Sequence, residues 1–327
     1  MGINEQYFSA AMERLEERRR ANRLESDMRR SEVESKIPEY RELSLKLGET
    51  GSEIVRLVMR GGDTSKELAE VERRNLEIQK RLAELLYENG YPEGYLKPIY
   101  TCSICQDKGI VNDKWCQCFQ KLLMEETARE LNRNSPLSLS SFESFRLDLY
   151  PDVINPALRV SERAIMQRNL EFCKSYAENF TEQSEGILMS GATGLGKTHL
   201  SLAIASKVLQ KGYTVIYGSS PELLHTLERE YFGKSDKDTM SALTGCDLLI
   251  FDDLGAEMDK PLYESLLYEI INARVCRRLP MIVSTNYNTT DLQKHYPDKI
   301  CSRLLSFRLM AFFGNDIRRV LKKEAKF

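Results

Sequence analysis

The sequence predicts an α/β protein in which a five-stranded parallel sheet follows an α-helical region and a small cysteine-containing module. Three observations carry this prediction. Short apolar segments alternate with helix-like segments after residue 142, which is typical of a parallel sheet covered by helices. Four cysteines cluster between residues 102 and 118, and residues 5–88 are dense in Glu, Arg, Lys and Leu. The expected domains are 1–90, 91–134 and 135–327, and a chain of 327 residues is long enough for them.

The composition excludes several classes of protein. A formal net charge of −2 gives no global attraction for polyanions, so any contact with nucleic acid must come from a local patch. No run of eighteen apolar residues occurs, and the first residues lack the pattern of a signal peptide. Eight cysteines in so long a chain do not indicate a disulfide scaffold. We therefore expect a cytoplasmic protein without membrane contact.

The first region predicts several α-helices. Apolar residues keep a helical spacing between Glu67 and Leu86. Pro38, the segment 48–51 and the pair Gly61-Gly62 interrupt the region, and sustained heptads are absent. An α-helical docking module fits this pattern. A solvated or partly disordered charged arm is the alternative.

Four of the eight cysteines form two close pairs. Two residues separate Cys102 from Cys105, and one residue separates Cys116 from Cys118. Two such pairs supply the four thiolates of a tetrahedral Zn²⁺ site, which would be structural because no coordination position stays open. A redox Cys-x-x-Cys pair and buried cysteines without metal are the alternatives.

Five short, mostly apolar segments are the expected strands, as strands buried on both faces should be. They are 186–190, 214–218, 247–252, 281–285 and 309–313. A Ser-rich linker is expected before them, at residues 135–141.

The first of these strands leads into the most informative motif of the chain. Eight residues match the phosphate-loop pattern G-x-x-x-x-G-K-[ST], and a helix-like segment follows. They are Gly191, Ala192, Thr193, Gly194, Leu195, Gly196, Lys197 and Thr198. The backbone N–H groups of such a loop surround nucleotide phosphates. Lys197 is expected to reach the β- and γ-phosphates, and the Thr198 hydroxyl to bind Mg²⁺.

An acidic pair complements the phosphate loop. The apolar segment 248–251 ends in Asp252 and Asp253. Asp252 is placed to hold Mg²⁺ through water, and Asp253 to polarise the attacking water as a base. A solvated pair of loop carboxylates is the alternative.

Three further residues are candidates by their serial order. Asn286 follows the strand at 281–285, which is expected between the phosphate-loop strand and the Asp252 strand, so its amide would orient water at the γ-phosphate. It is otherwise a turn residue. Arg303 precedes the last strand and Arg318 follows it, and a guanidinium aimed at the γ-phosphate offsets charge in the transition state. Taken singly, each arginine is more often a surface ion-pair partner.

In this order the motifs resemble those of the AAA+ ATPases, and within them the bacterial replicative helicase loaders of the DnaC/DnaI type, which share the IstB-like ATP-binding domain. The segments that carry the resemblance are 191–198 for Walker A, 248–253 for Walker B, 285–286 for sensor 1, 302–304 for the arginine finger and 316–318 for sensor 2. Arg319 is the alternative to Arg318. The resemblance covers the chain from about residue 142, and it implies an AAA+ sheet without the usual C-terminal helical lid.

The resemblance also implies a function. Such a protein is an ATPase that uses ATP, Mg²⁺ and structural Zn²⁺ to load the replicative DNA helicase onto single-stranded DNA during initiation of replication. Its N-terminal region would dock onto the helicase, and protomers would associate through the ATP site, each placing Arg303 in its neighbour's site. The alternatives are an IstB-like transposase-helper ATPase and an ATP-switched DNA-binding adaptor with little turnover.

The resemblance also implies weak binding of single-stranded DNA, for which the segment 221–240 is the candidate surface. Tyr231 and Phe232 would stack on bases, and Arg229, Lys234 and Lys237 would meet phosphates. An apolar helix with a charged face is the alternative, and five acidic residues in the segment oppose strong binding.

Overall fold

The computed structural model describes residues 5–60, 64–133, 135, 137, 140–156, 159–233 and 238–319. The chain divides into two compact units, one formed by Met12–Phe119 and the other by Met1–Ala11 with Gln120–Phe327. The long helices and the cysteine segment thus share one unit, while the boundaries at residues 90 and 134 stay a prediction. Pro136, Ser138 and Leu139 of the expected linker lie outside the described residues.

Three helices open the chain: α1 (Glu5–Lys36), α2 (Pro38–Arg60) and α3 (Ser65–Glu88). Pro38 occupies the first turn of α2, where its missing N–H costs no hydrogen bond. The interruption expected at residues 48–51 is wrong, because α2 runs through both glycines of this segment. Nothing lies within 4 Å of a Cβ placed at Gly48 or Gly51, so the glycines weaken the helix without ending it. Gly61 and Gly62 lie outside the described residues.

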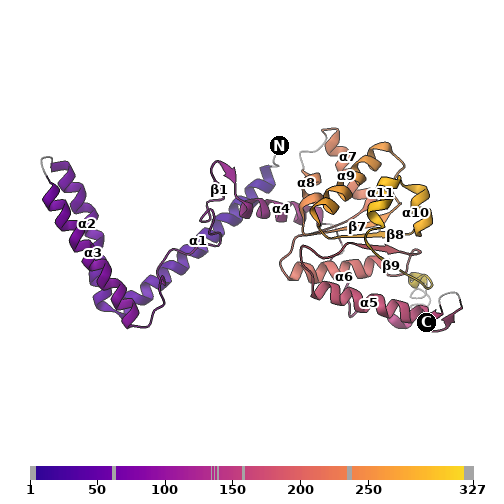
Figure 1. Cartoon of the computed structure of the whole chain (residues 1–327), viewed down its shortest axis with the longest axis horizontal. Helices are drawn as coiled ribbons and strands as arrows, with labels where there is room; N and C mark the ends of the chain where they lie inside the picture. The colour runs from indigo at the N-terminus through magenta and orange to yellow at the C-terminus, as the bar shows by residue number, and fades with distance from the viewer. Residues whose placement is uncertain are drawn as a thin grey trace. The chain divides into compact units, whose positions relative to one another are not determined.

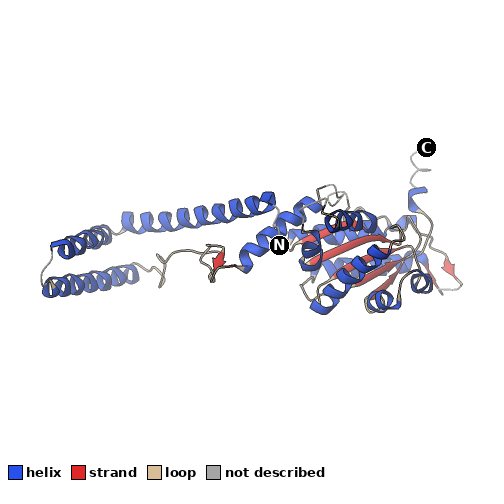
Figure 2. Ribbon diagram, turned by 90° about the horizontal axis from the view of Figure 1, so that it is seen from above, coloured by secondary structure: helices blue, strands red, loops and turns tan. Residues whose placement is uncertain are grey.

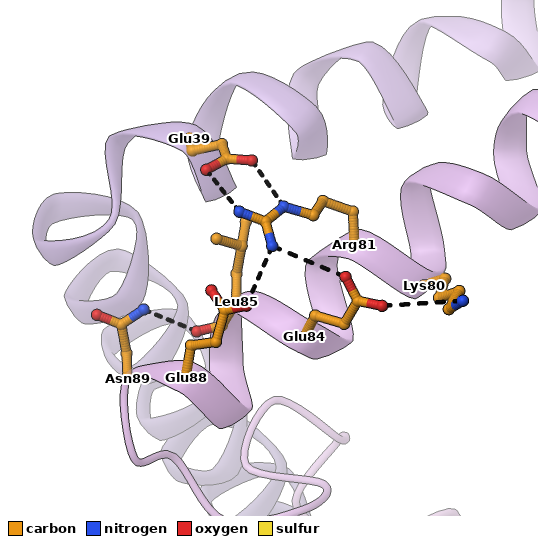
Figure 3. A network of polar contacts seen from close by, with 7 residues as sticks. All are labelled: Glu39, Lys80, Arg81, Glu84, Leu85, Glu88 and Asn89. Carbon is orange, nitrogen blue, oxygen red and sulfur yellow. Dashed lines mark hydrogen bonds and ion pairs between the residues drawn. The ribbon is translucent and has the colours of Figure 1, made fainter.

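Helices α2 and α3 lie side by side and are joined by ion pairs (Figure 1). Arg81 of α3 donates to both carboxylate oxygens of Glu39 on α2, from Nε at 2.8 Å and from Nη2 at 3.1 Å. Its Nη1 reaches Glu88 at 3.2 Å, and Arg74 pairs with Glu53 further along the two helices. Figure 3 shows that Arg81 stands at the centre of this network. The charged composition of this region therefore forms ordered helices.

The cysteine segment is built on a short hairpin. Strands β1 (Ile110–Val111) and β2 (Lys114–Trp115) pair antiparallel through a turn in which Asn112 and Asp113 both have positive φ, at 49° and 59°. This is the two-residue turn whose twist matches that of paired strands. Helix α4 (Gln117–Leu131) begins directly after the hairpin.

The second unit is an α/β domain with a five-stranded, all-parallel sheet in the order β6-β7-β8-β5-β9. The strands are β5 (Ile187–Ser190), β6 (Val215–Ser219), β7 (Leu248–Leu254), β8 (Met281–Thr285) and β9 (Arg308–Ala311). The helices are α5 (Glu162–Glu178), α6 (Lys197–Gln210), α7 (Ser220–Tyr231), α8 (Thr239–Gly245), α9 (Pro261–Arg277), α10 (Thr289–His295) and α11 (Asp298–Leu304). A 3₁₀ turn (Leu147–Leu149) and a small hairpin of β3 (Ile154–Asn155) and β4 (Val160–Ser161) precede α5. The predicted fold class and all five expected strands are confirmed.

Alternate residues of the strands feed two hydrophobic cores, one on each face of the sheet. Ile187 and Met189 of β5 belong to the core with α5 and α6, whereas Leu188 belongs to the core with α7, α8, α9 and α11. Figure 1 shows the sheet between these two helical layers, and Figure 2 shows its strands in red among the helices. Because both faces are covered, the strands can be apolar throughout, which is why the sequence reveals them as short apolar runs.

Within the described residues, no helix is both long enough and apolar enough to span a membrane.

Candidate functional site

The phosphate loop connects β5 to α6 and requires its glycines. Gly194 and Gly196 have φ values of +80° and +88°, in the left-handed region that favours glycine. A Cβ at Gly194 would lie 2.0 Å from a carboxylate oxygen of Asp316, and one at Gly196 would lie 2.9 Å from the ring of Phe145 and from the hydroxyl oxygen of Tyr150. The N-terminus of α6 begins at Lys197, so the loop and the helix end together offer backbone N–H groups to an anion.

Lys197 folds over its own loop. Its Nζ donates to the carbonyl oxygens of Gly191 at 2.5 Å and Ala192 at 2.8 Å, and to Oδ1 of Asn286 at 2.8 Å. Burial lowers the pKa of this ammonium, against the opposing effect of Asp253 and Asp252. A phosphate that enters the loop would offer Lys197 a charged acceptor in place of neutral carbonyls.

Three hydroxyl groups surround Asp252 at the end of β7. Its Oδ2 accepts hydrogen bonds from Thr198 Oγ1 and from the Tyr217 hydroxyl, both at 2.9 Å. Its Oδ1 accepts one from Ser284 Oγ at 2.5 Å. The structure therefore brings together Thr198 and Asp252, the two residues whose oxygen atoms the sequence predicts as ligands of Mg²⁺. Hydroxyl and carboxylate oxygens are ligands that Mg²⁺ prefers.

Asp253 is held next to this cluster by its backbone. Its φ of 55° is unusual for a residue other than glycine, and its N–H donates to Ser284 Oγ at 2.9 Å. Burial, reinforced by the charge of Asp252, raises the pKa of the Asp253 carboxyl, while Lys197 and Arg318 act in the opposite direction. A carboxylate whose pKa is raised is a better base than an ordinary aspartate.

The strand order brings Asn286 to the same place. Strand β8 lies between β5 and β7, as expected, so Asn286 follows the end of a central strand. Its Oδ1 accepts from Lys197, and the residue lines the same cavity as Asp253.

A cavity of about 330 Å³ opens beside the phosphate loop, within the range typical of small-molecule sites. Its other wall consists of residues that sequence reasoning missed: Ser144, Phe145, Arg146, Leu149 and Tyr150. The rings of Phe145 and Tyr150 stack with centroids 5.7 Å apart, and the Tyr150 hydroxyl donates to the Leu195 carbonyl at 2.9 Å. The aromatic part of this wall, packed beside the phosphate loop, suits the base and sugar of a nucleotide.

Tyr217 and Ser284 were also missed. Burial, together with the nearby charge of Asp252, raises the pKa of Tyr217, so the phenol keeps its proton and donates. Both residues belong to strands adjacent to β7, and their contact with Asp252 depends on the pairing register. A polar residue near the carboxyl end of an apolar strand was the available signal in each segment.

The two candidate arginines differ in position. Arg318 lines the cavity, whereas the side chain of Arg319 is 85% exposed and pairs with Asp316. The geometry thus favours Arg318 over Arg319 at the site. Arg303 does not line the cavity: it donates to Asn272 at 2.9 Å and to the hydroxyl of Tyr268 at 3.1 Å, packed over that ring.

The four clustered cysteines converge in the first unit. All four sulfur atoms lie within 4.8 Å of one another, with 3.8 Å between Cys102 and Cys116 and 3.4 Å between Cys105 and Cys118. Zinc–sulfur bonds of about 2.3 Å in a tetrahedron place the sulfurs about 3.8 Å apart, so the cluster fits zinc. The backbone N–H of Cys105 lowers the pKa of the Cys102 thiol to about 7, whereas burial raises the pKa of Cys118. The geometry is compatible with a structural metal site.

Helix α1 fixes the loop that carries the first cysteine pair. Asp107 is buried and accepts from the backbone N–H groups of Thr101 and Cys102, at 2.9 and 2.8 Å, and from Asn22 of α1 at 2.9 Å. Arg19 of α1 donates to the carbonyl of Asp107 at 2.6 Å. The cluster is therefore coupled to the long helix by side-chain hydrogen bonds.

The segment expected to contact DNA forms most of α7 and the beginning of α8. Tyr231 and Phe232 are exposed at 69% and 60%, in an edge-to-face pair, and Arg229 is exposed. Lys234 and Lys237 lie outside the described residues.

The fold and the site define an α/β domain of the phosphate-loop class. Residues 161–311 match the family model described as IstB-like ATP binding protein. Among relatives, the replicative helicase loader DnaI of Bacillus subtilis (strain 168) is 27% identical over 137 residues, which cover 42% of this chain and 43% of that protein. The replicative helicase loader DnaC of Escherichia coli (strain K12) is 24% identical over 153 residues, covering 46% of this chain and 62% of that protein.

A solved structure aligns with part of this chain. The crystal structure of the DnaC helicase loader aligns with a TM-score of 0.47 at 20% identity, covering 55% of this chain and 99% of that chain. The relatives in sequence confirm the predicted resemblance to loaders of the DnaC/DnaI type for the domain that carries the phosphate loop. The matched segment spans about half the length of these curated relatives.

Proposed function

We propose that the protein is an ATP-dependent loader of the replicative DNA helicase onto single-stranded DNA during initiation of replication. The observation that supports this most is the convergence of Lys197, Asp253 and Asn286 on one cavity in a domain that resembles helicase loaders. Asp252 accepts a hydrogen bond from Thr198 in the wall of this cavity. The phosphate loop would bind the triphosphate, and the ring pair of Phe145 and Tyr150 would support the base.

Hydrolysis would follow from the placement of the side chains. Thr198 and Asp252 would hold Mg²⁺, which neutralises charge on the β- and γ-phosphates. Lys197 would bind the same phosphates, Asp253 would accept a proton from the attacking water, and Asn286 would orient this water. Asp253→Asn should keep ATP affinity and lower the rate of hydrolysis by about 10²-fold or more, since a general base is removed.

Arg318 would contact the γ-phosphate within the same chain, and Arg303 would act in the site of a neighbouring protomer. Tyr268 and Asn272 hold Arg303 in one orientation, and Arg303 does not line the cavity beside the phosphate loop of its own chain. A guanidinium that is already oriented loses little freedom when it enters a partner's site. ATP binding would thereby join protomers, and hydrolysis would weaken the assembly and release the helicase.

The first unit would dock onto the helicase, and the exposed Tyr231 and Phe232 would give weak contact with single-stranded DNA. A pull-down with the full-length protein and the replicative helicase tests the docking. A complex formed with ATP and lost on hydrolysis is the expected result, and no association in either state would contradict helicase loading.

A transposase-helper ATPase is the second candidate, because the matching family model is described as IstB-like. The same pull-down with a transposase as bait separates the two functions. The third possibility, an adaptor with little turnover, would show unchanged partner exchange in Asp253→Asn.

We also propose that the four cysteines hold one structural Zn²⁺ per chain. Elemental analysis should find about one zinc per protein, since the donor set is complete in four thiolates. Cys116→Ser should lose most of the metal, whereas Cys276→Ser, at an exposed cysteine outside the cluster, should keep it. Equal zinc contents in the two variants would contradict the assignment.

A further inference from the structure

Glu257 follows the acidic pair and connects three parts of the domain. We propose that it is a positioning residue, whose carboxylate holds the turn behind Asp253 and joins this turn to α7 and to the segment before α11. The inference rests on the proposed ATPase activity, because a fixed position of Asp253 matters for its role as the base in ATP hydrolysis.

The turn at 253–256 is a conformation that needs support. Asp253 has a φ of 55° and Gly255 one of +100°, and the Ala256 N–H closes the turn on the Asp253 carbonyl at 3.1 Å. A Cβ at Gly255 would lie 2.3 Å from the ring of Tyr287, so the turn is also tightly packed. The positive φ of Asp253, which is not a glycine, persists only where surrounding contacts fix it.

Glu257 supplies such contacts from its own side chain. Its Oε2 accepts from the Gly255 N–H at 2.9 Å and from Ser220 Oγ, in the first turn of α7, at 2.6 Å. Its Oε1 accepts from the hydroxyl of Tyr296, between α10 and α11. Burial and the charge of Glu257 raise the pKa of Tyr296, so this phenol stays a donor. One carboxylate thus meets three donors from three elements, and hydrogen bonds to a charged acceptor are strong.

A second contact fixes the other end of α7 to the same part of the chain. Glu228, near the C-terminal end of α7, accepts from Lys260 Nζ at 2.7 and 2.9 Å and from the Tyr263 hydroxyl at 2.9 Å. Helix α7 is therefore joined at both ends to the segment 255–263. A displacement of α7, whose end carries the exposed Tyr231, would be transmitted to the turn behind Asp253.

The test compares Glu257→Gln with wild type and with Glu182→Gln, the same change on an exposed loop residue. The first measurement is hydrogen–deuterium exchange of the full-length protein without nucleotide. We expect the amides of residues 253–257 to exchange about fivefold faster or more in E257Q, and at the wild-type rate in E182Q.

The second measurement separates positioning from general stability. E257Q should lower kcat for ATP about tenfold while the Kd of a fluorescent ATP analogue changes less than about twofold, because the phosphate loop is untouched. Tyr296→Phe and Ser220→Ala each remove one donor and should give smaller losses. If they act through Glu257, the double variant E257Q/Y296F should be no slower than E257Q alone.

Wild-type exchange at residues 253–257 in E257Q, or an unchanged kcat, would overturn the proposal. Should E257Q fail to fold, Y296F and S220A carry the same measurements. Should the wild-type protein hydrolyse no ATP, the proposed function fails, and the exchange rates alone decide on Glu257.

Discussion

At the scale of single residues, the site is organised around a carboxylate that is already surrounded by donors. Thr198, Tyr217 and Ser284 all direct hydroxyl groups to Asp252. Such an arrangement fixes the rotamer of Asp252 before any ligand binds. The site is therefore preorganised for a charged ligand. The sequence motifs identified Thr198 because it belongs to a contiguous eight-residue pattern, and Asp252 because it directly follows an apolar segment. It did not identify Tyr217 or Ser284, because these contacts depend on which strands become neighbours.

Lys197→Ala should weaken ATP binding at least about tenfold, because it removes the buried ammonium that we propose binds the phosphates. Titration with a fluorescent ATP analogue measures the effect. Lys207→Ala, on the exposed last turn of α6, is the matched control and should bind as wild type does. Equal affinities in the two variants would show that the loop binds phosphate without its lysine.

At the scale of elements, α2 shows how packing overrides a local signal. The pair of glycines predicted an interruption, yet the helix continues because α3 lies alongside it and ion pairs join the two. The sequence predicted the strands better than the course of these helices. A short apolar run between helical segments is buried, and a parallel sheet is one of the few structures in which its backbone N–H and C=O groups all find hydrogen-bond partners. The segment 144–150 was missed since its role appears only when it packs against the phosphate loop.

Gly48→Ala should raise the free energy of unfolding of the first unit by about 0.5–1 kcal/mol, because the site is helical and has room for a Cβ. Chemical denaturation followed by circular dichroism measures this. Gly109→Ala should have the opposite sign, since Gly109 has a φ of +78° and its Cβ would lie 2.7 Å from Leu15. Destabilisation by Gly48→Ala would mean that α2 is not continuous there.

The bidentate pair of Arg81 and Glu39 in Figure 3 gives the α2–α3 contact a dependence on pH. The hydrogen bond from Arg81 lowers the pKa of the Glu39 carboxyl below its ordinary value. The stabilisation is therefore complete above the ordinary glutamate pKa of about 4.3 and is lost as the pH falls through the lowered value. Amide exchange in α2 and α3 should be faster in Glu39→Gln than in wild type at pH 7.

This difference in exchange should shrink at acidic pH, where Glu39 is protonated in both states of the wild-type protein. Glu42→Gln, at an exposed position of α2, serves as the control and should match wild type at both pH values. A difference between Glu39→Gln and wild type that does not change with pH would show that the pair contributes nothing through its charge.

At the scale of the whole molecule, the candidate residues do not all meet within one chain. Lys197, Asp253, Asn286 and Arg318 line one cavity, but Arg303 is fixed elsewhere on the domain by Tyr268 and Asn272. The serial order of motifs predicted which residues would be involved, and the structure distinguishes those that meet from the one that does not. Sequence alone could not make this distinction, because it depends on where α11 packs against α9.

A mixture of two inactive variants tests whether Arg303 acts between protomers. Lys197→Ala removes the phosphate-loop lysine and Arg303→Ala removes the finger, so each protein alone should hydrolyse ATP at least about tenfold more slowly than wild type. Mixing them should restore part of the activity, since some sites would pair an intact loop with an intact finger. Failure of every mixing ratio to restore hydrolysis, with both variants folded, would contradict action between protomers.

The order of the strands has a consequence for folding of the protein during its translation. Strand β5, which carries the phosphate loop, pairs with β8 and β9, whose residues begin at positions 281 and 308. During translation, the apolar β5 stays unpaired until its partner strands are synthesised roughly a hundred residues later. Long-range pairing of this kind is slow and leaves hydrophobic surface exposed. A nascent chain would therefore gain nucleotide affinity late, and β5 would be a binding site for chaperones until β8 and β9 are synthesised.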